Sequence, residues 1–339
     1  MVIGETSRAA NWSIYGYNRN TNPELTKIKG LTAFSHVLTE SNTTHKSVPM
    51  LMSSVTAHDF NSIYRQKGII TAFKEAGYRT AFFSNQRYNH SFIDFFGKEA
   101  DICDFIKEDT GDGSYNPSDD ELLKLVAAEL AENASKQFIV LHTYGSHFNY
   151  RERYPADNAF FLPDFPVDAE LKYKDNLINA YDNSIRYTDN FLARLIRMLQ
   201  EQDIDAAMLY TSDHGEDIFD DDRHLFLHAS PVPSYYQIHV PFLVWMSDNY
   251  RKNYPDFLKN AEINRQKNIS SSASFFQTML ELGGIDTPSR NDSLSVINAS
   301  YTEKNRVYLN DHNEARSLND IGMREEDFTM LQTKGIVYR

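Results

Sequence analysis

Short apolar runs alternate with longer amphipathic stretches along most of this chain, and this alternation restricts the fold more than any other feature of the sequence. Several runs, such as FIVL at 138–141, are apolar along their whole length, as strands covered on both faces are. The sequence therefore predicts an α/β fold with a mostly parallel central sheet and helices on both faces. The expected strands are 2–3, 34–38, 79–84, 137–143, 206–211 and 240–246.

Four longer stretches have the apolar spacing of amphipathic helices. They cover 61–76, 118–133, 171–202 and 271–282. Ser118 and Glu121 form a capping-box pattern at the start of the second stretch. We expect the tail to form a hairpin around Lys334-Gly335, and the aromatic segment 148–166 to be an insertion beside a site.

The composition limits the architecture and the partners of the chain. Of the 339 residues, 41% are hydrophobic, which allows a large core, so we expect one domain spanning 1–339. The formal net charge of -13 opposes binding to nucleic acid. Cys103 is the only cysteine, so no intramolecular disulfide forms, and its apolar surroundings predict a small buried side chain.

The first residues of the chain read as the end of a buried strand. Val2-Ile3 is apolar and is followed at once by the polar residues from Gly4 onward. The sequence contains no run of about 18 apolar residues that would span a bilayer. We therefore expect the native gene to encode a further segment ahead of residue 1.

Polar clusters stand at the carboxyl ends of the expected strands. They are GETSR at 4–8, SNTTHKSVP at 41–49, HTYGSH at 142–147 and TSDHGE at 211–216. In folds of this type the carboxyl ends of parallel strands meet at one edge of the sheet, where ligands bind. We therefore expect the four clusters to form one site.

Asp213-His214 is the strongest metal-binding signal in these clusters. Carboxylate oxygens and imidazole nitrogens are ligands of first-row metals. Taken alone, the dipeptide is more often a surface turn with a capping Asp. Glu5, at another strand end, shifts the balance to a metal site, whereas His147 and His228 are as compatible with structural roles as with functional ones.

A threonine in the 41–49 segment is the candidate nucleophile. Thr43 and Thr44 are adjacent, and the residue types alone leave the choice between them open. Such a cluster of hydroxyls commonly caps a helix, whose N-terminus also stabilises phosphate oxygens. A threonine hydroxyl is a weak nucleophile, but coordination to a dication lowers its pKa and activates it.

Taken in order, these motifs resemble those of the bacterial phosphoethanolamine transferases that modify lipid A and lipopolysaccharide, members of the alkaline phosphatase and sulfatase superfamily. The pair GETSR and GYxRxTxP is the most specific part of the resemblance, which covers residues 2 to about 246. The matching stretches are VIGETSR at 2–8, GYNRNTNP at 16–23, THKSVP at 44–49, HTYGSH at 142–147, SDHGE at 212–216 and LH at 227–228.

The resemblance implies a catalytic zinc and identifies its ligands. It assigns the zinc to Glu5, Thr44, Asp213 and His214. Thr44 would be the nucleophile, because it stands three residues before Ser47 of the Ser-Val-Pro motif. The catalytic domain would therefore have a sulfatase-like fold and would bind one zinc ion or two.

Four further residues match positions near the substrate in the family. His147 and His228 correspond to positions that contact phosphate or a second zinc, and they are the candidate proton donors. Asn85 falls where the family has a substrate-binding polar residue, and Lys46 is placed to bring a cation to the phosphate. The chain departs from several family members in having one cysteine where they have several disulfides.

The resemblance also implies partners and a location. The donor would be phosphatidylethanolamine, and the acceptor lipid A or a lipopolysaccharide sugar. The domain would face the periplasm beside the bacterial inner membrane, anchored there by membrane helices upstream. Transfer would pass through a covalent phosphoethanolamine-threonine intermediate.

Three alternative functions stay open. A phosphoglycerol transferase of the same superfamily also uses a metal-bound threonine. A phosphodiesterase or sulfatase is the nearest hydrolase, although a sulfatase needs a CxPxR-type motif, which Cys103 lacks. An envelope binding module that kept the fold without catalysis would be expected to have lost a metal ligand, and all four are present.

Overall fold

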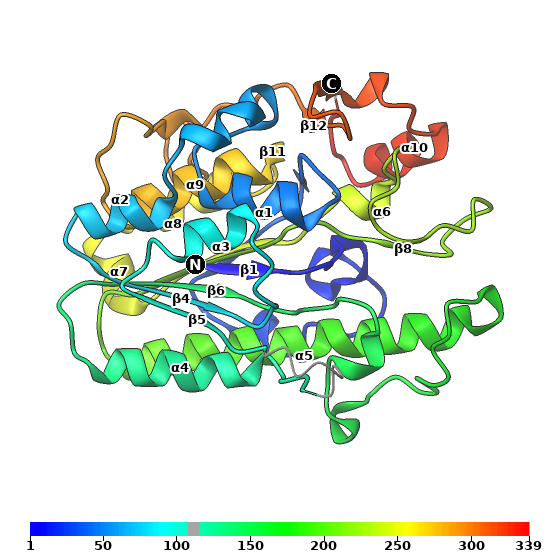
Figure 1. Cartoon of the computed structure of the whole chain (residues 1–339), viewed down its shortest axis with the longest axis horizontal. Coiled ribbons are helices and arrows are strands. Elements are labelled where there is room, and N and C mark those ends of the chain that lie inside the picture. Colours follow the sequence, from blue (N-terminus) through cyan, green and yellow to red (C-terminus); the bar gives the residue numbers. More distant parts are fainter. Residues whose placement is uncertain (108–114, 339) are drawn as a thin grey trace.

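The computed structural model describes residues 1–107 and 115–338, and Figure 1 shows them as a central sheet between helical layers. The large sheet has the strand order β2-β10-β7-β1-β6-β4-β5. Its neighbours pair in parallel except at β10, which is antiparallel to both β2 and β7. The predicted mostly parallel sheet is confirmed. Its strands are β1 (Val2–Gly4), β2 (Leu31–Phe34), β4 (Arg79–Ser84), β5 (Ile102–Phe105), β6 (Gln137–His142), β7 (Ala207–Ser212) and β10 (Phe242–Met246).

Two apolar cores lie on opposite faces of this sheet. Successive strand residues point to opposite faces, so Ile3 and Leu209 pack in one core while Val2 and Met208 pack in the other. In Figure 1 the long helices α4 (Asp120–Ala131) and α5 (Lys174–Glu201) cover the lower face. The upper face carries α1 (Thr44–Met52), α2 (Ile69–Glu75), α3 (Phe92–Gly97), α8 (Pro255–Asn264) and α9 (Ser271–Leu282).

Smaller elements complete the chain around a third apolar cluster near the C-terminus. Leu38, Tyr235, Tyr308 and Leu331 are among its members. The elements are β3 (Val37–Leu38), β8 (Asp217–Ile218), β9 (Phe226–Leu227), α6 (Tyr235–Ile238), α7 (Asp248–Asn253), β11 (Ile269–Ser270), β12 (Val307–Leu309), β13 (Ala315–Ser317) and α10 (Glu325–Thr333). Within the described residues, no helix has the length and hydropathy needed to cross a bilayer.

The predicted single helix over 61–76 is wrong. The chain forms a 3-10 helix, Ala57–Arg65, and then the separate helix α2. Gly68 is extended between them, and its N–H donates to the Glu99 carboxylate at 2.8 Å instead of continuing a helix. A tertiary contact therefore interrupts a segment whose apolar spacing is helical throughout.

The predicted capping box at Ser118 is also absent. Helix α4 begins at Asp120, and the preceding Asp119 makes no cap with its side chain. Instead the Asp119 carboxylate accepts from the N–H groups of Tyr144 and Gly145 at 2.8 and 2.9 Å. These bonds join the start of α4 to the loop after β6. Asp119 therefore holds the loop of the 142–147 cluster in place instead of capping the helix.

Three smaller predictions need correction. The expected strand 34–38 is divided, because β3 leaves the main sheet to pair with β11. The tail forms no hairpin at Gly335, where a left-handed glycine follows α10, and the hairpin is β12–β13 instead. Cys103 is half-buried on the edge strand β5, where burial raises the pKa of its thiol to about 11.

Candidate metal centre and active site

The polar clusters predicted at strand ends meet at the carboxyl edge of the sheet, toward the right in Figure 1. Glu5 directly follows β1, Asp213 and His214 directly follow β7, and Thr44 begins α1. The Asp213 N–H donates to the Gly4 carbonyl at 3.0 Å, which extends the pairing of β1 with β7. The sheet register therefore places Glu5 beside Asp213 although they are distant in sequence.

The turn after β1 is shaped around these carboxylates. Thr6 is buried with φ of 58°, a left-handed conformation that is uncommon for threonine. From this position the Thr6 N–H donates to Asp213 Oδ1 at 3.0 Å and its hydroxyl donates to Glu5 Oε1 at 2.7 Å. Backbone strain at a buried polar turn is a common feature of functional sites.

Glu5, Asp213 and His214 form a compact group of potential metal ligands. Their ligand atoms all lie within 4.8 Å of one another, and all three residues are buried. His214 Nε2 is 3.5 Å from Glu5 Oε1 and 3.3 Å from Asp213 Oδ2. Two carboxylates and one imidazole are a suitable donor set for zinc.

Hydrogen bonding leaves the right atoms available for a metal. His214 Nδ1 is 2.9 Å from the Gly215 carbonyl, which can only accept, so Nδ1 carries the proton and Nε2 presents a lone pair. Asp213 Oδ2 is buried and has no hydrogen-bond partner among the described residues. An orphaned carboxylate oxygen facing a lone pair is costly without a cation. The residues therefore fit a bound dication.

The electrostatics lead to the same conclusion. Burial, reinforced by the nearby Glu5, raises the pKa of Asp213 well above its usual value. Burial also raises the pKa of Glu5, but attraction to His214 and the neighbouring histidines outweighs it and holds that pKa at about 2. Burial lowers the pKa of His214 to about 3. At neutral pH His214 is therefore neutral, and Asp213 would hold a proton that a bound dication would displace.

The structure places Thr44, rather than Thr43, against this group. Thr44 Oγ1 lies 3.1 Å from Glu5 Oε1 and 3.0 Å from His214 Nε2. Thr43 is the extended residue before α1, and its hydroxyl bonds Ser41 at 3.2 Å instead. Helix α1 begins at Thr44 and continues through Pro49, so Thr44 stands at the positive end of the helix.

His147 and His228 lie beside the group without joining it. The His228 ring centroid is 4.2 Å from that of His214 and 6.2 Å from that of His147. His147 Nδ1 bonds the Phe148 carbonyl at 2.6 Å, which leaves Nε2 as the lone-pair nitrogen. Burial lowers the pKa of His228, but the Glu216 carboxylate outweighs it and raises the net value. His228 is therefore suited to carrying a proton.

The other two expected substrate residues have protein partners. The Lys46 ammonium donates to the Asn310 carbonyl at 2.8 Å. Asn85 is buried and donates to the Asp119 carboxylate at 2.8 Å. Asp119 in turn holds the loop before His147, so the contacts of Asn85 are those of a positioning residue.

The sequence reasoning missed Gln86 and gave no role to His142, which it had included in the cluster at 142–147. Gln86 Nε2 donates to Glu5 Oε2 at 2.8 Å, so the loop after β4 reaches the metal group through Gln86. His142 ends β6 with a buried Nε2 that has no partner within the described chain, and burial lowers its pKa to about 4. Gln86 could have been found from its position, because it is a polar residue just after β4. Polar residues after strands were the pattern that identified the other clusters.

Comparison with known families agrees with this fold. The model of the sulfatase family matches residues 1–285, so the chain belongs to the sulfatase family. Within this family it is similar to phosphoethanolamine transferases. One is phosphoethanolamine transferase EptC of Escherichia coli, which is 26% identical over 90% of this chain and 54% of the relative. Another is the Kdo(2)-lipid A phosphoethanolamine 7''-transferase of E. coli, 32% identical over 79% of this chain and 47% of the relative.

Solved structures extend the similarity to the fold. The C-terminal periplasmic domain of E. coli EptC, crystallised in complex with zinc, aligns with a TM-score of 0.84 and 25% identity over 95% of this chain and 92% of that one. The soluble domain of lipooligosaccharide phosphoethanolamine transferase A from Neisseria meningitidis aligns with a TM-score of 0.77 and 25% identity, covering 87% and 90%. The chain spans about half the length of the curated relatives it matches.

Proposed function

We propose that this chain is the catalytic part of a zinc-dependent transferase that moves phosphoethanolamine from phosphatidylethanolamine to lipid A or a lipopolysaccharide sugar. The observation that carries the proposal is the position of Thr44, whose hydroxyl touches Glu5 and His214 at the start of α1. Phosphoethanolamine transferases among the relatives, one of them named for lipid A, support this reaction and acceptor.

Glu5, Thr44, Asp213 and His214 are the residues that would hold the zinc. A bound zinc ion would supply the positive charge that lowers the pKa of the Thr44 hydroxyl and offsets charge on the phosphate oxygens. The zinc complex of the structurally similar EptC domain supports this choice of metal. One ion fits the group of three ligands, and His147 with His228 would border a second.

In the first step, Thr44 Oγ1 forms a bond to the donor phosphorus and the bond from phosphorus to the glycerol oxygen breaks. The Thr44 proton passes to solvent before the attack, because a bound dication would lower the pKa of the hydroxyl. His228, whose pKa is raised beside Glu216, gives a proton to the departing diacylglycerol. The product is phosphoethanolamine-threonine at Thr44.

In the second step, an acceptor hydroxyl attacks the same phosphorus and its proton passes to His228. The bond between phosphorus and Thr44 Oγ1 breaks, and a proton from solvent restores the threonine hydroxyl. The N-terminus of α1 faces the phosphate in both steps and stabilises its oxygens. In the whole protein, the domain would face the periplasm from the inner membrane, in agreement with the periplasmic domain of EptC.

A covalent adduct on Thr44 tests the proposal directly. Intact-mass analysis after incubation with phosphatidylethanolamine should show a phosphoethanolamine adduct on the wild-type chain. Thr44→Ala should show none, Thr44→Ser should retain some, and the matched control Thr43→Ala should retain most of it. An adduct that persists in Thr44→Ala would refute the assignment, and one lost only in Thr43→Ala would identify the other threonine.

A further inference from the structure

A cluster of aromatic rings, most of them exposed, lies on α3, on the 3-10 helix before α2 and on the loop between β4 and α3. Tyr64, Phe92, Phe95 and Tyr88 form it, and we call it the α3 aromatic surface. The rings of Tyr64 and Phe92 meet edge to face at 5.1 Å, and those of Phe92 and Phe95 are 6.4 Å apart. Tyr64 is 77% exposed, Phe95 56% and Tyr88 40%. Large neighbouring rings are seldom this exposed unless they meet a partner.

The charges around these rings are unlike those of the chain as a whole. Lys98 is exposed and donates to the Tyr88 hydroxyl, and Arg65 is exposed next to Tyr64. The carboxylates of the same elements bond backbone N–H groups instead. Asp59 accepts from Thr56, Asp94 from Asn89 and Ser91, and Glu99 from Gly68. The surface therefore presents cations beside aromatic rings, in a chain whose net charge is -13.

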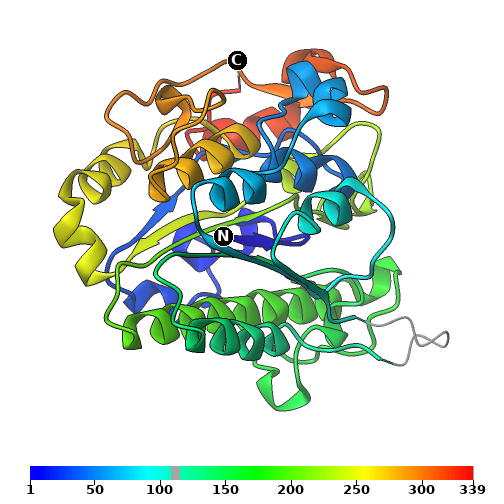
Figure 2. The same ribbon diagram turned by 60° about the vertical axis from the view of Figure 1, so that its left-hand side comes forward.

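Two short connections link the α3 aromatic surface to the active site. Tyr88 stands two residues after Gln86, whose amide donates to Glu5. Helix α1, which begins at Thr44, packs against α3, and the two helices lie on the same layer in Figures 1 and 2. A structure seated on this surface would therefore lie close to the nucleophile.

We propose that the α3 aromatic surface docks onto the surface of a phospholipid bilayer. Tyrosine and phenylalanine rings are suited to the boundary between head groups and acyl chains, and exposed Lys and Arg attract anionic lipids. Docking there would present lipid phosphates to the edge where Thr44 lies. This last step rests on the proposed function, whereas binding to the bilayer does not.

The molecule contains a matched control for this proposal. The loop before α5 exposes Phe160 to 58% and Phe165 to 71%, much as the α3 aromatic surface exposes its rings. The residues flanking these rings in the chain include the exposed acids Asp157, Asp168 and Glu170, and the Arg186 guanidinium lies 4.1 Å from the centre of the Phe160 ring. Similar ring exposure with more acidic surroundings should bind an anionic bilayer less well.

Vesicle sedimentation with the 339-residue chain tests the docking. Vesicles of phosphatidylethanolamine and phosphatidylglycerol should carry the wild type down, and about 0.5 M salt should weaken the binding. The double variant Tyr64→Ser, Phe95→Ser should bind about tenfold more weakly, because it loses two interfacial rings. Phe160→Ser, Phe165→Ser should bind like the wild type. Lys98→Glu should weaken binding without removing any ring.

Activity assays separate this proposal from the proposed function. The Tyr64, Phe95 variant should lose turnover of donor lipid in vesicles but keep the adduct formed from donor dispersed in detergent. Absence of wild-type binding, or equal loss in the Phe160, Phe165 variant, would overturn the docking. A dimer that disperses in the Tyr64, Phe95 variant would assign the surface to a second copy instead. Absence of the adduct with binding intact would count against the proposed function alone.

Discussion

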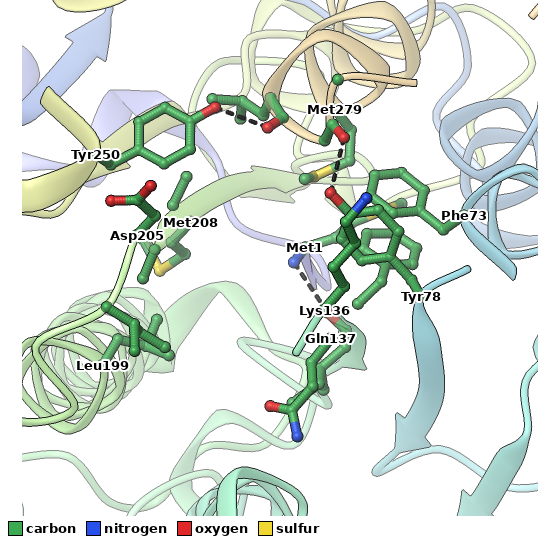
Figure 3. A pocket seen from close by; sticks show the side chains of 18 of the residues that line it. Met1, Phe73, Tyr78, Lys136, Gln137, Leu199, Asp205, Met208, Tyr250 and Met279 are labelled. Carbon is green, nitrogen blue, oxygen red and sulfur yellow. Dashed lines mark hydrogen bonds between the residues drawn. The ribbon is translucent and has the colours of Figure 1, made fainter. Parts of the chain in front are cut away.

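The two edges of the central sheet are built from the same strands but have opposite characters. At the carboxyl edge, Glu5, Asp213 and His214 are buried together, and Asp213 Oδ2 has no described partner. At the amino edge, a pocket of about 760 Å³ is partly open to solvent, and its lining includes the apolar side chains of Leu199, Met208 and Met279 (Figure 3). One edge buries polar groups together, and the other has a pocket that solvent can enter.

The difference suggests how stability and function are distributed. Buried polar groups without partners destabilise a fold, so the carboxyl edge costs stability that a metal would restore. The pocket at the amino edge is lined by residues of the two apolar cores and contains none of the proposed catalytic groups. Changes at the first edge should therefore separate activity from stability, whereas changes at the second should affect stability alone.

Asp213→Asn should reduce transfer activity more than any other change considered for either edge. If activity is retained, the proposed contrast between the two edges is wrong. The substitution removes a proposed ligand and one buried carboxylate while keeping the shape of the side chain. We expect transfer activity to fall about a thousandfold or more. The metal-free variant should unfold at an equal or higher temperature than the metal-free wild type, because repulsion from Glu5 is relieved. Lower stability without metal would show that Asp213 is needed by the fold itself.

The second prediction concerns zinc, which should raise the stability of the wild type on binding. At free zinc about 100-fold above Kd, the free energy of unfolding should rise by about 3 kcal/mol. Calorimetry with and without a chelator would measure it, together with elemental analysis of the purified protein. Asp213→Asn is the control and should show little of the increase. A chain free of zinc with full activity would contradict the metal site.

The sequence predicted the carboxyl edge well because its signals are local. Three of the four clusters directly follow strands of the main sheet, and the parallel sheet brings those strand ends together whatever the details of the connections. The cluster at 41–49 follows β3, which pairs with β11 instead. The choice between Thr43 and Thr44 needed the family resemblance, and the geometry now favours Thr44. The roles of these residues stay predictions.

The misses arise where a distant residue decides the local structure. Glu99 captures the Gly68 N–H and divides the predicted helix over 61–76. Asp119 bonds Tyr144 and Gly145, so the expected capping box does not form. Local sequence patterns do not predict either contact, because each hydrogen bond joins segments more than twenty residues apart. The amino-edge pocket was not predicted at all, since the shape of a surface hollow leaves no periodic signal.

Glu40, two residues after β3, should make the stability of the folded protein depend measurably on pH. Burial raises the pKa of its carboxyl to about 7 from 4.5. The folded state thus binds a proton that the unfolded state has lost, so stability should fall as pH rises from about 4.5 to about 7, by on the order of 3 kcal/mol. Urea unfolding across this range should show that decline flattened in Glu40→Gln. Glu75→Gln, at an exposed acid, is the control and should leave it unchanged.

The smallest expected effect is a difference in unfolding free energy between substitutions of two neighbouring residues on β7. It tests the contrast between the two edges from the amino side. Met208 lines the pocket, whereas Leu209 points to the opposite face and is buried in the other core. Met208→Ala enlarges a space that already exists, so it should cost about 2 kcal/mol of unfolding free energy. Leu209→Ala opens a new cavity among close-packed side chains and should cost about 4 kcal/mol.

Denaturant unfolding of both variants would measure that difference, with transfer activity assayed on the folded protein. Activity should stay within about twofold of the wild type in each case, because neither side chain reaches Thr44 or the metal ligands. Equal costs would mean that the space beside Met208 is filled or collapsed in solution. A large loss of activity in Met208→Ala alone would mean that the amino edge is coupled to the catalytic edge through β7, and the separation of the two edges would then be wrong.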